Sequence, residues 1–519
     1  MSPSNLFEHL FATERDASVA ILFEHREITY RDLREQTSTV AEILKAEGIE
    51  PGDRVALLLA DSPEFIAAFV AIISLGAIAI PINLALQSAE QLFIVRDCGA
   101  RAAIVEGQVA RTLIEGLDSS ADLKTVFTVR DDGPRPTANL RVFALEGAPR
   151  QNIEGFPAKT NPNDDAFILY TSGSTGQPKG AVHSQAHIFY TNETFCREVL
   201  QLRDDDRVFS SSRLPFAYGL GNSFTFPLLN GRTTVLCREK PTPEVVGNIF
   251  SDYRPTIFLG VPVVYRMLLE HHRNVARLDA SSLRLCVSAG EALPAHLGQE
   301  WQDTFGVEVL DGIGSTEMLH MFISNHSGDL QYGSSGKLLR GYEARLVDHE
   351  GNPTRTGEEG NLWIKGRSAA SRYWQRPEIS AETFVDGWVR TGDLYASDAD
   401  GFWWHMGRSD DCFKPTGQWV SPIEVESVLL KHAGVRAAAV VEGFDEAELS
   451  CVCAFIVSAA DTEKIENELR ELCMNALPRF KQPRRYLFVS ELPYTATGKV
   501  QRFKLREQLR GEATGTVSS

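Results

Sequence analysis

Short apolar runs alternate with amphipathic stretches from the N-terminus to about residue 400. Helical patterns separate these runs, and such an order is typical of parallel sheets with helices packed on their faces. The pattern therefore predicts an α/β fold for this part of the chain. The clearest predicted strands are residues 54–59, 102–105, 125–129, 256–259 and 283–287.

The pattern changes near residues 407–412, and a different order of elements follows. Beyond this point the sequence predicts a small α+β domain, because helices and short strands follow one another over a length that suits one compact unit. We expect a large α/β domain with mixed or parallel sheets at residues 1–409 and a small α+β domain at residues 410–519. The elements expected in the small domain are helices at 422–432 and 463–476 and strands at 437–441, 451–457 and 485–489.

The most apolar stretch of the chain, Phe65–Ile82, is not predicted to cross a membrane. Gly76 and Pro81 interrupt it, acidic residues precede it, and it lacks a basic flank, so a core helix that runs into a strand explains it better. Residues 1–15 contain no apolar core of the length of a signal peptide. We therefore expect a cytoplasmic protein without a membrane partner.

Composition and charge narrow the range of partners. The 519 residues are 43% hydrophobic and 23% charged, as in an ordinary soluble protein, and the formal net charge is -17. No excess of Lys and Arg exists to neutralise a phosphate backbone, so nucleic acid is not expected as a partner. The eight cysteines form no Cys-x-x-Cys pair, which favours free thiols in a reducing compartment over a zinc site.

Residues 170–180 carry the strongest chemical signal, Tyr-Thr-Ser-Gly-Ser-Thr-Gly-Gln-Pro-Lys-Gly, and an apolar run at 166–170 leads into it. Glycines let a backbone approach phosphates closely, hydroxyls donate hydrogen bonds, and a lysine adds positive charge. The spacing is not that of a Walker loop, because Pro178 stands where the second glycine of that motif belongs. The stretch therefore serves a different phosphate chemistry, or it is an exposed turn rich in turn-forming residues.

Further small-residue or charged stretches lie at predicted strand ends and turns. The carboxyl ends of strands are where ligands bind in open α/β sheets, so the set favours a nucleotide site. Each stretch alone could equally be a helix start, a cap or a surface charge. The stretches are Ser288-Ala289-Gly290-Glu291, Asp311-Gly312-Ile313-Gly314-Ser315-Thr316-Glu317, Thr391-Gly392-Asp393 and Gly498-Lys499.

In this order the stretches resemble the adenylate-forming superfamily, which includes acyl- and aryl-CoA ligases, adenylation domains and firefly-type luciferases. Gly407-Arg408 with Asp410, and Lys414-x-x-Gly417, fit the same pattern, so the resemblance spans most of the chain. Within the superfamily, the segments at 216–222, 311–320, 407–411 and 418–422 are similar to those of benzoate–CoA ligases.

The resemblance implies a two-step, ATP-dependent ligation of an aromatic carboxylic acid. A benzoate-type acid and ATP form an aryl-adenylate with release of pyrophosphate, and CoA then displaces AMP to give the aryl-CoA thioester. Mg²⁺ is expected with ATP, and CoA is expected as co-substrate. The alternatives are a stand-alone enzyme that loads the aryl group onto a carrier protein and a non-catalytic nucleotide sensor. The oligomeric state is expected to be a monomer or a homodimer.

The resemblance also implies that the large domain holds the ATP and acyl sites, that the small domain is mobile, and that single residues have defined roles. Lys499, Thr316 and Glu317 are expected to be catalytic, and Glu317 is also expected to ligate Mg²⁺. The nucleotide is expected at Thr171, Ser172, Gly173, Ser174, Thr175, Gly176, Lys179, Ala289, Gly290, Glu291, Asp311, Gly312, Ile313, Gly314, Ser315, Asp393 and Arg408. The acyl group is expected at Phe216, Ala217, Tyr218, Gly219, Phe226, His320 and Met321. The hinge and CoA tunnel are expected at Asp410, Lys414 and Gly417.

Two departures from the superfamily and one regulatory expectation complete this picture. Phe216 stands where many relatives have a histidine that gates the acyl site, so that role is in doubt here. Ile313 stands where many have a tyrosine stacked on adenine, although benzoate-type members share this feature. The segment 493–499 resembles an acetylation site, so a lysine acetyltransferase and deacetylase are expected to act on Lys499.

Overall fold

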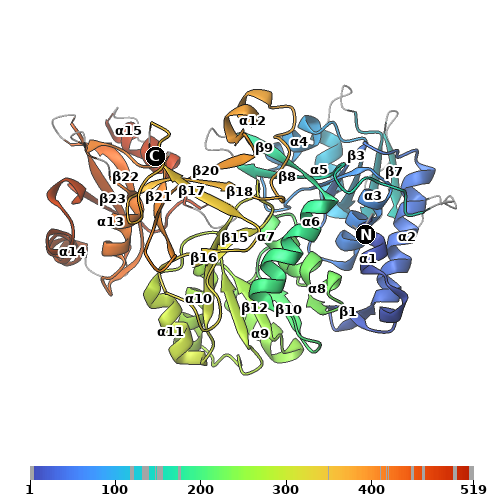
Figure 1. The fold of residues 1–519 in the computed structure, drawn as a ribbon, viewed down its shortest axis with the longest axis horizontal. Helices are drawn as coiled ribbons and strands as arrows, with labels where there is room; N and C mark the ends of the chain where they lie inside the picture. Colours follow the sequence, from blue (N-terminus) through green and yellow to red (C-terminus); the bar gives the residue numbers. More distant parts are fainter. Residues whose placement is uncertain are drawn as a thin grey trace. The chain divides into compact units, whose positions relative to one another are not determined.

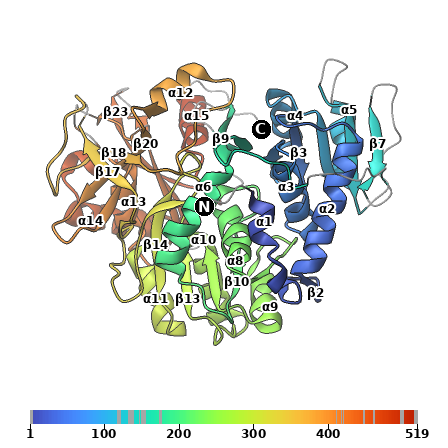
Figure 2. The ribbon, with the colours of Figure 1, turned by 45° about the vertical axis from the view of Figure 1, so that its right-hand side comes forward.

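The computed structural model describes residues 5–116, 122–130, 140–145, 148, 156–172, 177–348, 350–409, 411–415, 418, 420–445, 449–458, 462–494 and 500–513. The chain divides into two compact units (Figures 1 and 2). Unit 1 comprises Met1–Glu343 and Ile364–Arg390, and unit 2 comprises Ala344–Trp363 and Thr391–Ser519. Unit 2 thus takes one segment from the middle of the chain, whereas the domain boundary predicted at 409/410 stays a prediction.

A seven-stranded sheet forms one half of unit 1, with the order β7-β6-β5-β3-β4-β8-β9. Neighbouring strands are parallel except for the β8–β9 pair at one edge. The strands are β3 (Arg54–Leu58), β4 (Ile78–Pro81), β5 (Ala102–Glu106), β6 (Thr125–Val129), β7 (Arg141–Ala144), β8 (Asp165–Ser172) and β9 (Pro178–Ser184). The first three strands predicted from the sequence are therefore confirmed as β3, β5 and β6.

A nine-stranded mixed sheet forms the other half of unit 1, with the order β16-β15-β14-β13-β12-β10-β11-β1-β2. Its central strands are parallel, and β15, β16 and β2 run antiparallel to their neighbours. The strands are β1 (Val19–Phe23), β2 (Arg26–Thr29), β10 (Arg207–Ser210), β11 (Thr233–Val235), β12 (Ile257–Gly260), β13 (Leu285–Ser288), β14 (Val309–Gly314), β15 (Met321–Ser324) and β16 (Lys337–Leu338).

Helices cover the faces of these sheets. Figure 1 shows α2 (Tyr30–Ala46), α3 (Pro63–Ser74), α4 (Ser88–Asp97) and α5 (Gly107–Gly116) around the seven-stranded sheet. Beside the nine-stranded sheet, Trp301 and Tyr265 pack with Phe258 in one buried cluster. The helices there are α9 (Pro243–Tyr253), α10 (Pro262–Asn274) and α11 (Ala295–Phe305), and the remaining helix of the N-terminal segment is α1 (Leu6–Leu10).

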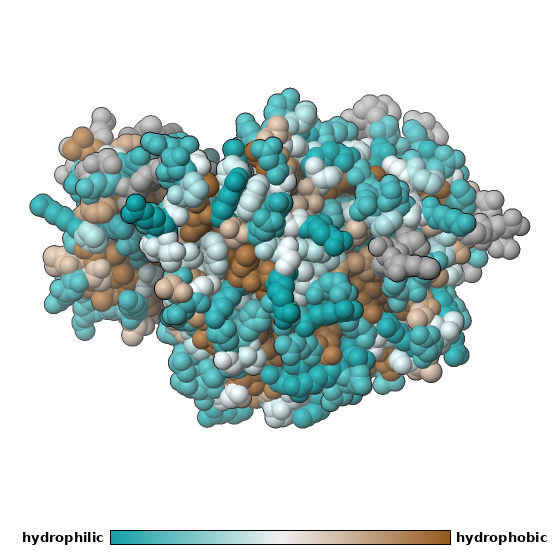
Figure 3. All heavy atoms as spheres, viewed as in Figure 1, coloured by the Kyte–Doolittle hydropathy of each residue, from teal (hydrophilic) through white to brown (hydrophobic). Residues whose placement is uncertain are grey.

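The apolar stretch at residues 65–82 forms α3 and β4, as predicted. Ser62 caps α3 by accepting a hydrogen bond from the Phe65 N–H (3.3 Å), and Pro63 occupies the first turn, where its missing N–H does no harm. Every residue of α3 except Glu64 in its first turn is buried, and the helix is apolar on all sides beyond that turn because it lies in a core. Among the described residues, no helix is long and apolar enough to cross a membrane, and hydrophilic side chains dominate the face seen in Figure 3.

Residues 337–408 differ from the predicted alternation of strands and helices, and the prediction is wrong there. This stretch is rich in strands: the five-stranded sheet has the order β17-β18-β20-β19, and β21 pairs with β20. β18 alternates buried and half-buried positions, and the other strands of this sheet are only partly buried, so they lack the continuous apolar runs used to find strands elsewhere. The elements are β17 (Glu343–Val347), β18 (Gly360–Lys365), α12 (Pro377–Thr383), β19 (Phe384–Val385), β20 (Trp388–Ser397) and β21 (Trp403–Arg408).

The C-terminal part of unit 2 is a compact α+β structure, as predicted. Its three-stranded sheet has the order β22-β23-β24, antiparallel and then parallel. Cys451 and Cys453 point to the same buried cluster, as expected for alternate residues of one strand. The elements are α13 (Pro422–Leu429), β22 (Val435–Phe444), β23 (Ser450–Ser458), α14 (Thr462–Ala476), β24 (Arg485–Phe488) and α15 (Arg502–Ala513). The predicted fold class, a large α/β part with a smaller α+β part, is confirmed.

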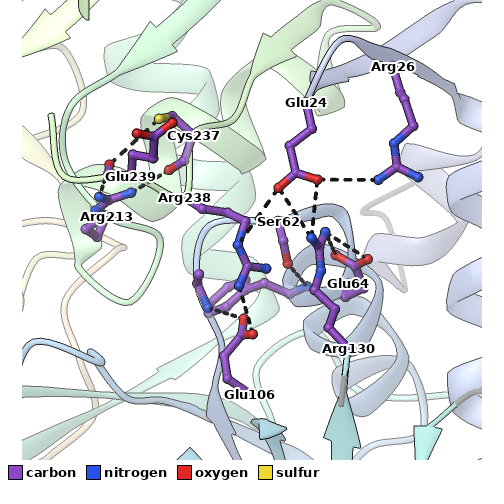
Figure 4. Close-up of polar contacts among 12 residues, drawn as sticks. Glu24, Arg26, Ser62, Glu64, Glu106, Arg130, Arg213, Cys237, Arg238 and Glu239 are labelled. Atoms are coloured by element: carbon purple, nitrogen blue, oxygen red, sulfur yellow. Dashed lines mark hydrogen bonds and ion pairs between the residues drawn. The ribbon is translucent and has the colours of Figure 1, made fainter. Parts of the chain in front are cut away.

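An ion-pair network in unit 1 joins the ends of strands from both of its large sheets (Figure 4). Glu106, at the end of β5, accepts a hydrogen bond from Arg238 Nη2 (2.9 Å), just after β11. Arg130, at the end of β6, lies between Glu24 (3.2 Å) and Glu64 (3.3 Å). The network therefore fixes the edge at which the carboxyl ends of parallel strands meet.

Candidate active site

The predicted phosphate loop connects the two strands of a β-hairpin. Strands β8 and β9 pair antiparallel from Asp165 with Ser184 to Ser172 with Pro178. A side chain at Gly180 would place its Cβ 2.5 Å from Ile168 Cγ2, so this position needs a glycine. Gly173, Ser174, Thr175 and Gly176 lie outside the described residues.

Lys179 and Glu317, both predicted site residues, lie together in the structure. The Tyr373 hydroxyl donates a hydrogen bond to Glu317 Oε1 (2.5 Å) and accepts one from Lys179 Nζ (2.8 Å). Lys179 Nζ is 4.0 Å from the same carboxylate oxygen. Tyr373 was missed in the sequence because it is 56 residues from Glu317 along the chain, with no motif around it. This group, Lys179–Tyr373–Glu317, offers a cation and a carboxylate to a bound phosphate and its counter-ion.

The segment 311–317 continues β14 into a tight turn. At Gly314 a Cβ would lie 2.6 Å from the His320 carbonyl oxygen, and at Gly312 it would lie 2.5 Å from the Ile323 carbonyl oxygen. Glycines are therefore required for the close approach of β15. Ile313, between them, is half-buried.

Asp311 begins this segment and is itself buried. Its Oδ2 accepts a hydrogen bond from the Leu293 N–H (3.1 Å), and burial raises the pKa of Asp311 to about 8. Ala289, Gly290 and Glu291 follow the carboxyl end of neighbouring β13, and Gly290 has a φ of +94° that favours glycine. The two predicted nucleotide segments thus leave adjacent parallel strands at the same edge.

A narrow pocket, too tight in this structure to admit a water molecule, lies beside the turn that follows Glu317. Of the predicted acyl residues, Ala217 and His320 line it. The pocket wall also includes residues that the sequence did not reveal. They come from α6 (Gln185–Thr191), from α7 (Ala217–Leu220), from the π-helix η4 (Gly221–Thr225) and from the turn, and they are Ile188, Thr191, Leu220, Gly221, Thr225 and Leu319. The missed residues are ordinary apolar or small side chains, which carry no signal of their own in a sequence.

His320 lies in an aromatic surround. Its ring is 4.6 Å from the rings of Phe226 and Phe195 and 5.5 Å from that of Tyr218, centre to centre. Phe195 comes from the π-helix η3 (Asn192–Leu200), and Phe226 begins α8 (Phe226–Leu229). Burial lowers the pKa of His320 to about 3, so the ring is neutral at physiological pH. Its Nε2 is 3.2 Å from the buried Asn222 Oδ1, and an amide oxygen only accepts, so Nε2 carries the proton.

The remaining predicted acyl residues surround these groups. Phe216 precedes α7 (Ala217–Leu220), Tyr218 donates a hydrogen bond to the Val287 carbonyl (3.3 Å), and Met321 begins β15. A Cβ at Gly219 would lie 2.0 Å from the Arg213 carbonyl oxygen, so α7 packs directly on the loop before it. Arg213 in turn binds the Cys237 and Glu239 carbonyls, as Figure 4 shows.

Asp393 and Arg408 form a pair within unit 2. They face each other across strands β20 and β21, and Arg408 Nη1 donates a hydrogen bond to Asp393 Oδ1 (3.0 Å). Gly392 has a φ of +75°, and a Cβ there would lie 2.9 Å from Arg408 Nη2, so the glycine makes room for this pair. Lys414, also in unit 2, is exposed. Asp410, Gly417 and Lys499 lie outside the described residues.

An α/β core with the β8–β9 hairpin, a glycine-rich strand end and a small C-terminal part is the architecture of an adenylate-forming enzyme. The AMP-binding enzyme family matches residues 7–374, and the AMP-binding enzyme C-terminal domain matches residues 424–499. The chain belongs to the AMP-binding enzyme family.

The similarity to individual relatives extends over nearly the whole chain. The benzoate–CoA ligase of Thauera aromatica is 41% identical over 483 residues, which are 92% of this chain and 90% of that one. The crystal structure of the anthranilate CoA ligase AuaEII with anthranoyl-AMP has a TM-score of 0.91 and 38% identity, covering 99% of both chains. The structure of a benzoate CoA ligase from Burkholderia xenovorans LB400 has a TM-score of 0.86 and 36% identity, covering 97% of this chain and 99% of the other.

Proposed function

We propose that the protein is an ATP-dependent aryl-CoA ligase that acts on benzoate-type acids. The observation that carries the proposal is one continuous turn, residues 315–320. It joins the Lys179–Tyr373–Glu317 group to a narrow, mostly apolar pocket whose His320 ring packs among aromatic rings. A carboxylate held in that pocket would therefore emerge beside the residues expected to hold the ATP phosphates. The identity to benzoate–CoA ligases over most of the chain supports the same acid class.

The first half-reaction joins the acid to AMP. A carboxylate oxygen attacks the α-phosphorus of ATP, and pyrophosphate leaves. Lys179 and the hairpin loop would hold the departing pyrophosphate, and Thr316 would contact the α-phosphate. Lys499 would neutralise the charge that builds up between carboxylate and phosphate, which makes this step mainly electrostatic and positional.

The residues present fit a Mg²⁺ ion that is held jointly by the protein and the phosphates of ATP, not one held by protein side chains alone. Glu317 supplies one partly accessible carboxylate, and the described part of the chain has no cluster of three or more His, Cys, Asp or Glu side chains that could hold a metal. Mg²⁺ commonly binds through one or two carboxylates together with substrate phosphates, which matches this arrangement. When bound, Mg²⁺ neutralises phosphate charge.

The second half-reaction forms the thioester. The CoA sulfur attacks the acyl carbon, and AMP leaves with the oxygen that came from the carboxylate. We expect Asp393 and Arg408 to bind the ribose hydroxyls, Asp410 to act as the hinge for a swing of the small domain, and Lys414 and Gly417 to line the CoA tunnel after it. We expect both steps to occur in the cytoplasm, and acetylation of Lys499 to stop the first by removing its charge.

A panel of acids tests the proposal. Benzoate, 2-aminobenzoate, 4-hydroxybenzoate, cyclohexanecarboxylate and a linear fatty acid are each incubated with ATP, Mg²⁺ and CoA, and both pyrophosphate and thioester are measured. We expect aromatic acids to give both products in equal amounts. If pyrophosphate forms but no CoA thioester does, and a carrier protein given in place of CoA becomes acylated, the carrier-loading alternative is favoured. No acid-dependent pyrophosphate release would contradict the proposal.

A further inference from the structure

Two buried histidines, His183 and His187, form a pair that touches the turn after β14. His183 lies on β9 and is 1% exposed, with its ring stacked on Phe167 of β8 (5.4 Å between centres, 19° between planes). Its Nε2 is 2.8 Å from the Thr316 carbonyl oxygen, and its Nδ1 is 3.0 Å from His187 Nδ1. Neither histidine belongs to the motifs that define the family resemblance.

The partners fix where the protons of this pair lie. A carbonyl oxygen only accepts, so His183 Nε2 must carry a proton. Burial and the neighbouring His187 hold the pKa of His183 well below its usual range, so the ring is neutral and its Nδ1 carries a lone pair. His187 Nδ1 must then donate to it. The Ser184 N–H also points at this His187 nitrogen, from 3.4 Å, as in a capping box. The contact to His183 is shorter, at 3.0 Å, and two neutral rings that meet through their Nδ1 atoms need one proton between them, so we assign that proton to His187.

The turn that His183 contacts carries residues of both expected subsites. The Thr316 carbonyl also accepts a hydrogen bond from the Leu319 N–H (3.1 Å), and Leu319 has a φ of +64°, an unfavourable conformation for a leucine. Leu319 lines the acyl pocket, whereas Glu317 faces Lys179. The orientation of the Thr316 carbonyl is therefore linked both to the residues expected to contact the acid and to those expected to contact the ATP phosphates.

Strand β9 holds this turn at two points. Successive side chains of a strand alternate between its faces, so Lys179 and His183, four residues apart, lie on the same face. Lys179 reaches the Glu317 side chain through Tyr373, and His183 reaches the Thr316 backbone directly. His187 belongs to α6, whose next residue, Ile188, lines the pocket.

We propose that His183 is a positioning residue for adenylation, which sets the Thr316–Glu317 turn through its Nε2–H, and that His187 fixes the tautomer required. The inference rests on the proposed roles of Thr316 and Glu317. The inference explains why two neutral histidines are buried here. Apolar side chains of similar size would fill the same space and would leave no buried polar group in need of a hydrogen-bond partner.

Substitutions at His183 separate positioning from packing. His183→Phe keeps a ring against Phe167 but removes the donor, His183→Gln places an N–H near the position of Nε2, and His183→Asn places one near Nδ1 instead. We expect His183→Phe and His183→Asn to lower the kcat of acid-dependent pyrophosphate release about 10- to 100-fold, with the KM for the acid nearly unchanged, and His183→Gln to recover most of it. Thioester formation from supplied aryl-adenylate should change much less.

A purely structural role would give a different result. If His183→Phe lowered only the melting temperature and left the kcat per folded molecule unchanged, the proposal would be overturned. If His183→Phe does not fold, the Gln and Asn variants decide, because equal activity in these two would contradict a donor at Nε2. Glu317→Gln serves as the reference: an active Glu317→Gln enzyme would remove the proposed role of the turn, whereas an inactive one beside an active His183→Phe would overturn only the role of His183.

The tautomer can be observed directly in the unmodified protein. With nitrogen-15 histidine incorporated at the 12 histidines, the His183 ring should show a slowly exchanging Nε2–H and an unprotonated Nδ1 near neutral pH. His187→Phe keeps an aromatic ring at that position but removes the donor to Nδ1, and it should broaden or lose the Nε2–H signal. A protonated Nδ1 on His183 in the unmodified protein would contradict the assignment.

Discussion

At the scale of single residues, Asp311 shows how burial changes a side chain at the candidate nucleotide site. It is 3% exposed, and burial raises its pKa to about 8. The folded protein therefore keeps a proton that the unfolded chain releases near pH 4, and the stability contributed by the neutral carboxyl is lost as pH rises toward 8. Asp311→Asn should remove this loss, since an amide keeps an oxygen that can accept from the Leu293 N–H.

Urea unfolding of both proteins between about pH 6 and pH 8 measures this effect. The free energy of unfolding of the variant, relative to the unsubstituted protein, should increase with pH by at most about 1.4 kcal/mol per unit. Parallel curves across this range would show that Asp311 is already ionised in the folded state.

Tyr373 tests whether the group it bridges acts in the reaction. Tyr373→Phe removes the hydroxyl between Lys179 and Glu317, which are 4.0 Å apart, so both charged groups lose a buried partner. We expect kcat/KM for adenylation to fall about 10-fold, equivalent to ~1.4 kcal/mol. Tyr342→Phe is the matched control, because Tyr342 is also buried and its hydroxyl is 2.9 Å from Ser368 Oγ. Equal activity losses in the two variants would argue against a role for Tyr373 in the site.

At the scale of elements, the sequence located the strand ends but not everything that gathers around them. Continuous apolar runs predicted the parallel strands, and in the structure the glycines at 312 and 314 allow the close approach of β15. The strands of residues 337–408 were not predicted because they are only partly buried and lack continuous apolar runs. Tyr373 and His183 were not identified from the sequence, because their contacts join segments that are far apart in the chain and a local pattern holds no information about such contacts.

The short helix α7 depends on one glycine. Gly219→Ala would place a methyl group 2.0 Å from the Arg213 carbonyl oxygen, which is backbone and cannot move aside cheaply. We expect the KM for the aromatic acid to rise at least about 10-fold, or the protein to lose about 2 kcal/mol or more of stability. Gly247→Ala, in helix α9, is the control, because its methyl would meet only the flexible end of Leu278. Kinetic constants and melting curves equal to those of the unsubstituted protein for Gly219→Ala would contradict the packing described.

At the scale of the whole molecule, the two half-reactions should depend on different parts of the chain. Lys499 is expected to act only while the acid is joined to AMP. Lys499→Ala should therefore nearly abolish pyrophosphate release but largely spare thioester formation from supplied aryl-adenylate. Single-turnover assays of each half-reaction would check this, and equal loss in both would rule out the proposed role.

The central claim is that the acid is activated as an acyl-adenylate before CoA attacks. Benzoate labelled with oxygen-18 in its carboxylate, given with ATP, Mg²⁺ and CoA, tests it most directly, with mass spectrometry of the products. The account predicts one labelled oxygen in AMP and none in pyrophosphate, because the carboxylate oxygen that attacks the α-phosphorus leaves with AMP. Unlabelled AMP, or ADP together with labelled phosphate, would contradict it.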